Sequence, residues 1–308
     1  MLLARTIGGK AIRLLSDALM ENGGMHIKWE WVLIPPLLLS FGLLVASQFV
    51  FLRGSFFADL GVGRLGDTFS LRNYLRIFSD GFYLSSLWLT VKLSAITTAS
   101  TLIIGFPVAY TLARMRSKVS MYLLAMITAA SFVTIVIKLL GLNIIFSSSS
   151  QLNVVLMGTG LVSEPITILG KTLGVTIGLM YFTLAFFVIL LYGVVLSIPR
   201  ALEEASQILG ASRLRTYWRV VVPLALPGLV GSSLIVFNLC LGAFTSAALL
   251  GAGKVLTLPV LIQRTVLQDT KYGMGGALSV VLLVAGLLIN LVSLYAVTRL
   301  KASRGMTV

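Results

Sequence analysis

The chain has 308 residues, of which 57% are hydrophobic and only 11% are charged, and its mean hydropathy is +1.00. In a soluble domain about a quarter of the residues are charged, so this composition excludes an ordinary soluble fold and indicates an integral membrane protein. The net charge of +14 is not gathered in a basic and aromatic patch of a soluble segment, so we do not expect nucleic-acid binding.

Six uncharged runs have the length of about 20 residues that a helix needs to cross a bilayer. In chain order they are Trp31–Phe51, Leu93–Ala113, Val119–Ile137, Thr172–Ile198, Val220–Gly253 and Tyr272–Thr298. They lack the alternation of apolar and polar residues found in barrel strands, and an open sheet edge cannot be satisfied in lipid. The sequence therefore predicts an all-α membrane protein with six transmembrane helices. The first run is too long for the core of a signal peptide, so we expect it to be retained as a span.

The orientation follows from the Lys and Arg residues in alternate connections. One side of the membrane receives 14 of them and the other side receives 8, while Lys92 and Lys138 lie within or at the edges of spans. The richer side should be cytoplasmic. This predicts a cytoplasmic N-terminal segment (residues 1–30), a six-span domain (31–299) with a cytoplasmic loop at 199–219, and a cytoplasmic tail (300–308). Both termini are expected in the cytoplasm, and basic residues near the spans are expected to contact membrane lipid.

The chain offers little for catalysis or for binding a metal. Its one cysteine, Cys240, lies in an apolar run, and its one histidine, His26, has no second ligand nearby. Gly170-Lys171-Thr172 ends like a phosphate-binding loop, but Pro165 stands where that loop needs a glycine. We therefore expect no metal, no cofactor and no catalytic residue. The pair Gly174 and Gly178 forms a small-xxx-small pattern, which predicts close helix packing.

The cytoplasmic loop contains the acidic stretch EEASQILGAS, residues 203–212. Ser197 is a candidate N-cap, Pro199 suits a first helical turn, and Gly210 can end a helix in the left-handed conformation. These signals predict a short helix over residues 198–209. At 100° per residue its apolar and polar side chains separate into two faces. The apolar face holds Leu202, Ala205, Ile208 and Leu209, and the polar face holds Arg200, Glu203, Glu204 and Gln207.

A second helix is expected directly after this one. Ser212 can cap it, and it would run through Leu214, Tyr217 and Trp218 toward Pro223. The sequence thus predicts a helix, a turn and a helix at the membrane surface.

These residues resemble a known family. Glu204-Ala205-Ser206, then Gly210, then Val220, Val222 and Pro223, are similar to the EAA loop of binding-protein-dependent ABC importer permeases. The resemblance extends from about Phe69 to Arg299. Within that range, four further stretches resemble the spermidine/putrescine-type permease subfamily. They are Ser70-Leu-Arg-Asn-Tyr74, Gly105-Phe-Pro-Val-Ala-Tyr110, the segment from Leu142 to Pro165, and Leu241-Gly-Ala-Phe-Thr-Ser-Ala-Ala-Leu-Leu-Gly251.

The resemblance implies a type I ABC importer in the bacterial cytoplasmic (inner) membrane. Its partners would be a second permease subunit, which we expect to be a different chain, two cytoplasmic ABC ATPases, and a periplasmic or extracytoplasmic solute-binding protein. This chain would then hydrolyse no ATP. The EAA helix would dock on the ATPase. The residues that the resemblance assigns to this coupling are Glu203, Glu204, Ala205, Gly210, Ala211 and Pro223.

The solute is less clearly indicated by the sequence. In the third span this chain reads Phe132-Val-Thr134-Ile-Val-Ile-Lys138 and lacks the Trp and Tyr that polyamine permeases carry there. A polyamine-like solute stays open, and so do an amino-acid derivative, an opine-like compound, an organophosphonate or another small organic solute. The predicted spans contain no Asp or Glu at depth, which argues against the alternative of an ion-coupled secondary transporter.

Four residues within the spans are candidates for lining the solute pathway. They are Lys138, Tyr181, Phe187 and Asn238. Lys138 could instead extend its ammonium group to the headgroups, as Lys92 could. Asn238 could instead hydrogen-bond to a neighbouring helix.

Overall fold

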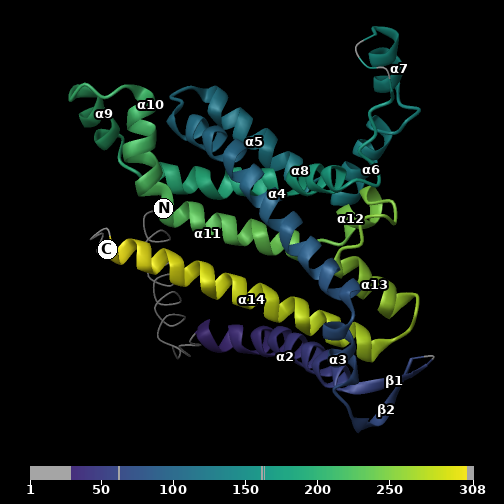
Figure 1. The fold of residues 1–308 in the computed structure, drawn as a ribbon. Coiled ribbons are helices and arrows are strands. Elements are labelled where there is room, and N and C mark those ends of the chain that lie inside the picture. Colours follow the sequence, from purple (N-terminus) through teal and green to yellow (C-terminus); the bar gives the residue numbers. More distant parts are fainter. Residues whose placement is uncertain (1–28, 62, 161, 163, 304–308) are drawn as a thin grey trace, which may run out of the picture. The chain divides into compact units, whose positions relative to one another are not determined.

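The computed structural model describes residues 29–303 except 62, 161 and 163 (Figure 1). Most of the expected N-terminal segment and the end of the expected C-terminal tail lie outside the described residues. The chain divides into two units, residues 1–53 and residues 54–308. The described part of the first unit belongs to the long apolar helix α2 (Trp29–Ser55), whose last two residues fall in the second unit. This helix begins and ends close to the predicted first span.

The second unit contains four long helices, α4 (Gly81–Arg114), α8 (Thr172–Leu196), α11 (Val222–Leu241) and α14 (Tyr272–Ser303). Together with α2, five helices of the described residues are long and apolar enough to cross a membrane, and a bent pair of helices makes a sixth if the pair counts as one span. The predicted all-α membrane fold is therefore confirmed, with five or six spans. Helix α4 begins twelve residues before the predicted second span because Asp80 caps it, accepting a hydrogen bond of 2.9 Å from the Phe82 N–H.

The main core lies where α4 packs against α8 and α11 (Figure 1). Phe187, Leu191 and Val236 are fully buried there. A second, smaller core joins α3 (Arg72–Ser79), α13 (Leu258–Leu267) and α14 through residues such as Ile77 and Leu278.

The third span is broken, which the sequence analysis did not predict. Helix α5 (Lys118–Phe132) ends before α6 (Ile135–Ile145), and the two axes meet at an angle of 94°. At 1.5 Å per residue α5 is only about 22 Å long, which is shorter than the hydrocarbon core of about 30 Å. Helix α7 (Gln151–Gly158) follows in the connection to α8.

The fifth span also ends earlier than predicted. Helix α11 stops at Leu241, and the short helix α12 (Thr245–Leu250) follows and packs against α6 and α8. A Cβ atom at Gly178 would lie 2.5 Å from Leu250 and 2.8 Å from Leu139. The absence of a side chain at Gly178 therefore allows α6 and α12 to approach α8, as the small-xxx-small pattern predicted.

A short antiparallel hairpin of β1 (Phe57–Gly61) and β2 (Arg64–Phe69) precedes α3, and no strand was predicted here. The Asp59 carboxylate accepts hydrogen bonds of 2.8 Å from the N–H groups of Gly273 and Met274. These groups belong to the first turn of α14, whose N–H groups have no partner within the helix. The hairpin is thereby attached to the start of α14.

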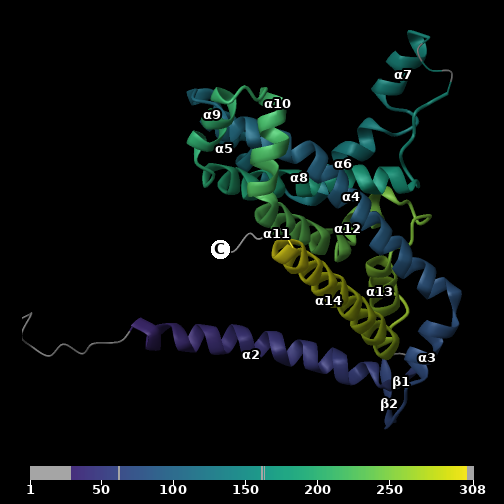
Figure 2. The same ribbon diagram turned by 60° about the vertical axis from the view of Figure 1, so that its left-hand side comes forward.

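At the other end of this unit lies the segment that contains EEASQILGAS (Figures 1 and 2). It consists of α9 (Arg200–Ile208), α10 (Arg213–Thr216) and a π-helical turn η1 (Tyr217–Val221), which continues into α11. We call residues 200–221 the knob. Pro223 follows the π-helical turn, near the start of α11. Because proline has no backbone N–H, it cannot donate a hydrogen bond to the preceding turn.

Candidate coupling site and the pocket beneath it

Helix α9 begins two residues later than predicted. Pro199 is its N-cap, whereas Ser197 closes the end of α8 and its hydroxyl donates a hydrogen bond of 2.7 Å to the carbonyl of Val194. The prediction of Ser197 as N-cap is therefore wrong. A serine hydroxyl bonds as readily to the preceding helical turn as to a following one, and here the preceding turn is present.

The end of α9 and the start of α10 follow the sequence prediction. Gly210 has a φ of +88°, in the left-handed region that favours glycine, and the N–H of Ala211 bonds back to the carbonyl of Ser206 at 3.1 Å. Ser212 caps α10 by accepting a hydrogen bond of 3.3 Å from the Arg215 N–H. The two helices of the knob are also joined by a contact of 3.1 Å between the hydroxyls of Ser206 and Thr216.

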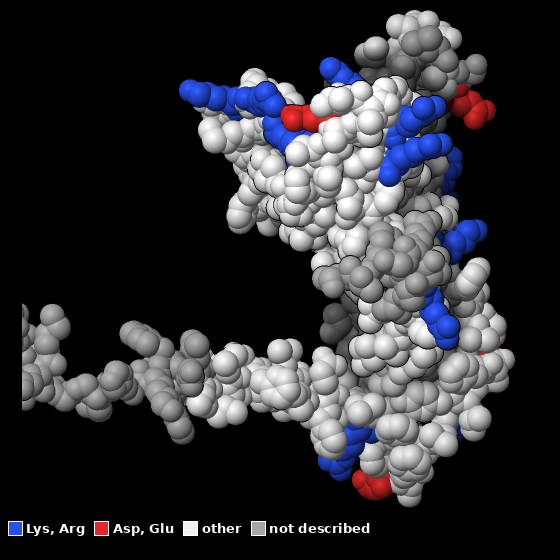
Figure 3. Space-filling view, turned by 90° about the vertical axis from the view of Figure 1, so that its left-hand side faces the viewer, with Lys and Arg blue, Asp and Glu red and all other residues white. Residues whose placement is uncertain are grey.

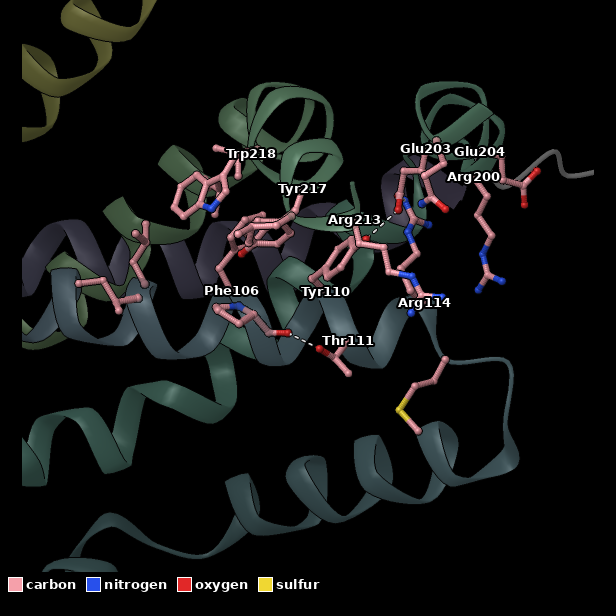
Figure 4. A pocket seen from close by; sticks show the side chains of 18 of the residues that line it. Phe106, Tyr110, Thr111, Arg114, Arg200, Glu203, Glu204, Arg213, Tyr217 and Trp218 are labelled. Atoms are coloured by element: carbon pink, nitrogen blue, oxygen red, sulfur yellow. Dashed lines mark hydrogen bonds and ion pairs between the residues drawn. The ribbon is translucent and has the colours of Figure 1, made fainter. Parts of the chain in front are cut away.

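The polar face of α9 is turned partly toward the rest of the protein. Glu203 is only 7% exposed. Its carboxylate accepts a hydrogen bond of 2.8 Å from the Tyr110 hydroxyl and lies 2.5 Å from the guanidinium of Arg114. Both partners come from the last turns of α4. In Figure 4 the Glu203 side chain points toward Tyr110, while that of Glu204 points away. Glu204 is exposed and lies 3.7 Å from Arg116.

Two arginines reinforce this junction. Arg114 donates a hydrogen bond of 3.0 Å to the carbonyl of Ile198, and Arg200 donates one of 3.1 Å to the carbonyl of Ala113. Carbonyls at helix ends lack partners within the helix, and a cation near them is favoured by the helix dipole. The end of α4 and the start of α9 are therefore joined by contacts in both directions.

The apolar face of the knob points outward. Ile208 is 85% exposed and Leu209 is 88% exposed, and Leu214 and Trp218 are exposed as well. Figure 3 views the end of the unit that carries α9 and α10, where basic side chains surround a small acidic area. Exposed apolar side chains that lie together on a charged surface are typical of a protein interface.

A pocket of about 1110 Å³ lies between the knob, the second half of α4 and the start of α11 (Figure 4). Its inner wall is aromatic. The ring centroid of Tyr217 lies 5.3 Å from that of Phe106 and 5.0 Å from that of Tyr110. The pocket wall also includes Arg114, Glu203 and Trp218. The stretch from Gly105 to Tyr110, singled out in the sequence, thus supplies part of this wall.

The four predicted solute-pathway residues do not lie in one place. Phe187 is fully buried in the main core. Its ring packs directly against Gly105 of α4, where an added Cβ atom would lie only 2.6 Å from Cδ1 of Phe187. In this structure Phe187 thus packs α8 against α4, and its place in the solute pathway stays a prediction. Asn238 forms a reciprocal pair of hydrogen bonds with Asn290 of α14, at 3.0 and 2.9 Å.

Lys138 and Tyr181 do lie together. Lys138 is 7% exposed, and its ammonium nitrogen lies 5.6 Å from the centroid of the Tyr181 ring, a cation–π contact. Among the described residues, no carboxylate forms an ion pair with Lys138. By contrast, Lys92 is exposed, as expected for a side chain that extends to the headgroups.

The sequence alone indicates neither Tyr110 and Arg114 as partners of the knob nor the contact of Thr216 with Ser206 inside it. By sequence alone Arg114 contributes only to the charge count that sets the topology, and Tyr110 belongs to the stretch Gly105–Tyr110 without a role of its own. A signal was present, because an arginine and a tyrosine four residues apart lie on one face of a helix.

The helices that cross the membrane, together with a knob that exposes an apolar face at one end, define a transport protein of the ABC importer permease class. Residues 101–304 match the family described as "Binding-protein-dependent transport system inner membrane component", and the chain belongs to this family.

Two relatives are proteins called spermidine/putrescine transport system permease protein PotB. The one from Haemophilus influenzae is 30% identical over 250 residues, which cover 81% of this chain and 83% of the relative. The one from Escherichia coli K12 is 33% identical over 222 residues, which cover 72% and 80%. These matches confirm the predicted class: the chain is a permease subunit of an ABC importer in the bacterial inner membrane.

Solved structures show the same fold. A chain of a bacterial ABC transporter involved in the import of the acidic polysaccharide alginate superimposes with a TM-score of 0.75 at 18% identity, covering 93% of this chain and 99% of that one. A chain of the MetNI methionine ABC transporter gives a TM-score of 0.55 at 21% identity, covering 70% and 94%.

Proposed function

We propose that this permease forms a solute pathway together with a second permease subunit of different sequence. An extracytoplasmic binding protein delivers a small organic solute to one side of this pathway. On the other side, two copies of a cytoplasmic ABC ATPase bind the complex, one of them through α9 of this chain. The chain itself is not an enzyme, and ATP is hydrolysed by the separate ATPase. Both termini and the knob are cytoplasmic in this arrangement.

The observation that carries the proposal is the two-sided arrangement of α9. Its inner side is fixed to α4 through Glu203, and its outer side exposes Ile208 and Leu209. An apolar face that is exposed on a firmly held helix suits docking into a groove of a partner protein. Gly210 and Ala211 set the turn that presents this face, and Ala205 and Glu204 lie exposed beside it.

The solute is proposed to be polyamine-like or derived from an amino acid. The relatives named for spermidine and putrescine favour the first class. The cation Lys138, close to Tyr181, favours a solute that also carries a carboxylate, because no acidic residue of the described spans would balance its charge. Thermal-shift measurements of the binding protein with both classes of compound will decide between them.

Transport by the reconstituted complex tests the proposal as a whole. Proteoliposomes that contain both permeases and the ATPase, with loaded binding protein present, should accumulate solute when ATP is supplied. Ionophores that collapse the proton and sodium gradients should leave this uptake intact. Uptake that follows an ion gradient without ATP would instead support a secondary transporter, for which no acidic residue is found in the described spans.

A further inference from the structure

We infer that Glu203 is a positioning residue that locks the coupling helix α9 to the end of α4, and that it does not contact the ATPase. This inference rests on the proposed function, since it assumes that α9 receives the movement of the ATPase. The inference gives different roles to Glu203 and Glu204, two neighbouring glutamates that the sequence placed together on one polar face.

The burial and the contacts of Glu203 carry the first step. Its carboxylate is enclosed by Tyr110 and Arg114, and the residue is 7% exposed. A buried carboxylate that holds an arginine and a tyrosine hydroxyl is not free to pair with another protein. Glu204, one residue later, is exposed and faces outward, so it is the glutamate that can reach a partner.

The second step concerns the stiffness of the junction. The contacts of Glu203 are supported by the hydrogen bonds from Arg114 to Ile198 and from Arg200 to Ala113, so several links join α9 to the same turn of α4. A charge-assisted network with few exposed atoms keeps one geometry better than a single exposed ion pair does. A displacement of α9 must therefore move the end of α4.

The third step follows α4 through the membrane. The helix has 34 residues, and near its other end the Thr90 hydroxyl accepts a hydrogen bond of 2.8 Å from the N–H of Leu258, the first residue of α13. Movement at the knob can therefore reach the elements at the opposite end through one continuous helix. Tyr110 also forms part of the pocket wall, so the same movement changes the shape of the pocket.

The variant Glu203→Gln tests this role in the full complex. It keeps the shape of the side chain and removes its charge. We expect the ATPase to co-purify at the wild-type ratio and basal ATP hydrolysis to stay within about twofold of wild type. The number of solute molecules taken up per ATP should fall by about threefold to thirtyfold, the range typical of a weakened coupling between sites. Glu164→Gln, at an exposed glutamate outside the knob, is the matched control and should behave as wild type.

Tyr110→Phe provides a second, milder variant that removes only the hydroxyl group. If Tyr110 and Glu203 act through each other, the double variant should be no worse than Glu203→Gln alone in uptake per ATP. Additive losses would overturn the inference. So would a wild-type ratio of uptake to ATP in Glu203→Gln, or a loss of ATPase co-purification in that variant.

Ile208→Asp distinguishes these outcomes from a failure of the proposed function. If α9 docks on the ATPase, this variant should lose the ATPase, regardless of whether Glu203 has the positioning role inferred above. If Ile208→Asp retains the ATPase and full uptake, then the docking proposal itself is wrong.

Discussion

Asn238 of α11 and Asn290 of α14 each donate one side-chain hydrogen bond to the other, although 52 residues separate them. Each amide also donates to a carbonyl of its own helix, Leu234 for Asn238 and Gly286 for Asn290. An amide in an apolar helix needs such partners, because an unsatisfied polar group in hydrocarbon is costly. The pair therefore ties two spans together, and this is the packing role that the sequence left open for Asn238.

Asn238→Ala should destabilise the permease because it removes the partner of Asn290. The interaction between two polar side chains of neighbouring membrane helices is worth about 0.6–2 kcal/mol. Thermal unfolding in detergent should show a lowered midpoint for each single alanine variant. In the double variant Asn238→Ala/Asn290→Ala the midpoint should fall by less than the sum of the two single decreases. Transport of related solutes should fall equally. A change in preference between solutes, with normal stability, would instead assign Asn238 to the pathway.

Gly210→Val should disturb the direction of the knob without preventing membrane insertion. The φ of +88° costs a residue with a side chain about 1 kcal/mol, and more when it is β-branched. We expect near-normal amounts in the membrane but a strong loss of ATP-driven uptake. Gly210→Asn is the matched control, since asparagine tolerates the left-handed conformation. Equal uptake by both variants would mean that the geometry of this turn is unimportant.

Lys138→Met should lower uptake, whereas Lys92→Met should leave it nearly unchanged. The two lysines differ in their surroundings: Lys138 is buried beside Tyr181, and Lys92 is exposed. Methionine keeps much of the length of the side chain and removes the charge. Initial rates over a range of binding-protein concentrations will show whether the maximal rate falls. If both variants transport at the wild-type rate, Lys138 has no part in the pathway.

The proposed orientation predicts opposite labelling of two introduced cysteines. After replacement of the native, buried Cys240 by alanine, a membrane-impermeant thiol reagent should label Asp67→Cys in intact cells. It should label Arg213→Cys only after the cells are opened. Both positions lie in connections between spans, one in the β2 strand and the other at the start of α10. The reverse pattern would contradict the count of basic residues.

Much of the knob could be predicted because its signals are local. Gly210 and Ser212 mark a helix end and a helix start through their own backbone and side-chain chemistry, and both behave as expected. Periodicity correctly placed Glu203 away from the exposed Ile208 and Leu209, but it also grouped Glu203 with Glu204, which the structure turns outward. It could not tell which face turns inward, because this depends on Tyr110 and Arg114, which are about 90 residues away in the chain.

The breaks within the spans were not predictable by the same means. Hydropathy identifies a run that can lie in the membrane, but it does not register a turn within that run. The 94° bend between α5 and α6 lies at Val133 and Thr134. Neither residue is a glycine or a proline, so the sequence gives no sign of a break there. The hairpin before α3 was missed for a different reason: its strands are short, and Asp59 stabilises them through a contact with α14 that is distant in the sequence.

The central claim is that α9 docks on the ATPase through its exposed apolar face, and co-purification of the ATPase with a variant of that face tests it most directly. The double variant Ile208→Asp/Leu209→Asp should reach the membrane normally, because both residues lie outside the spans. Loss of two central apolar contacts should cost about 2 kcal/mol or more, and thus reduce the bound ATPase more than tenfold. Val155→Asp, on the exposed face of α7, is the control and should retain the ATPase. Wild-type amounts of bound ATPase and wild-type uptake in the double variant would contradict the account.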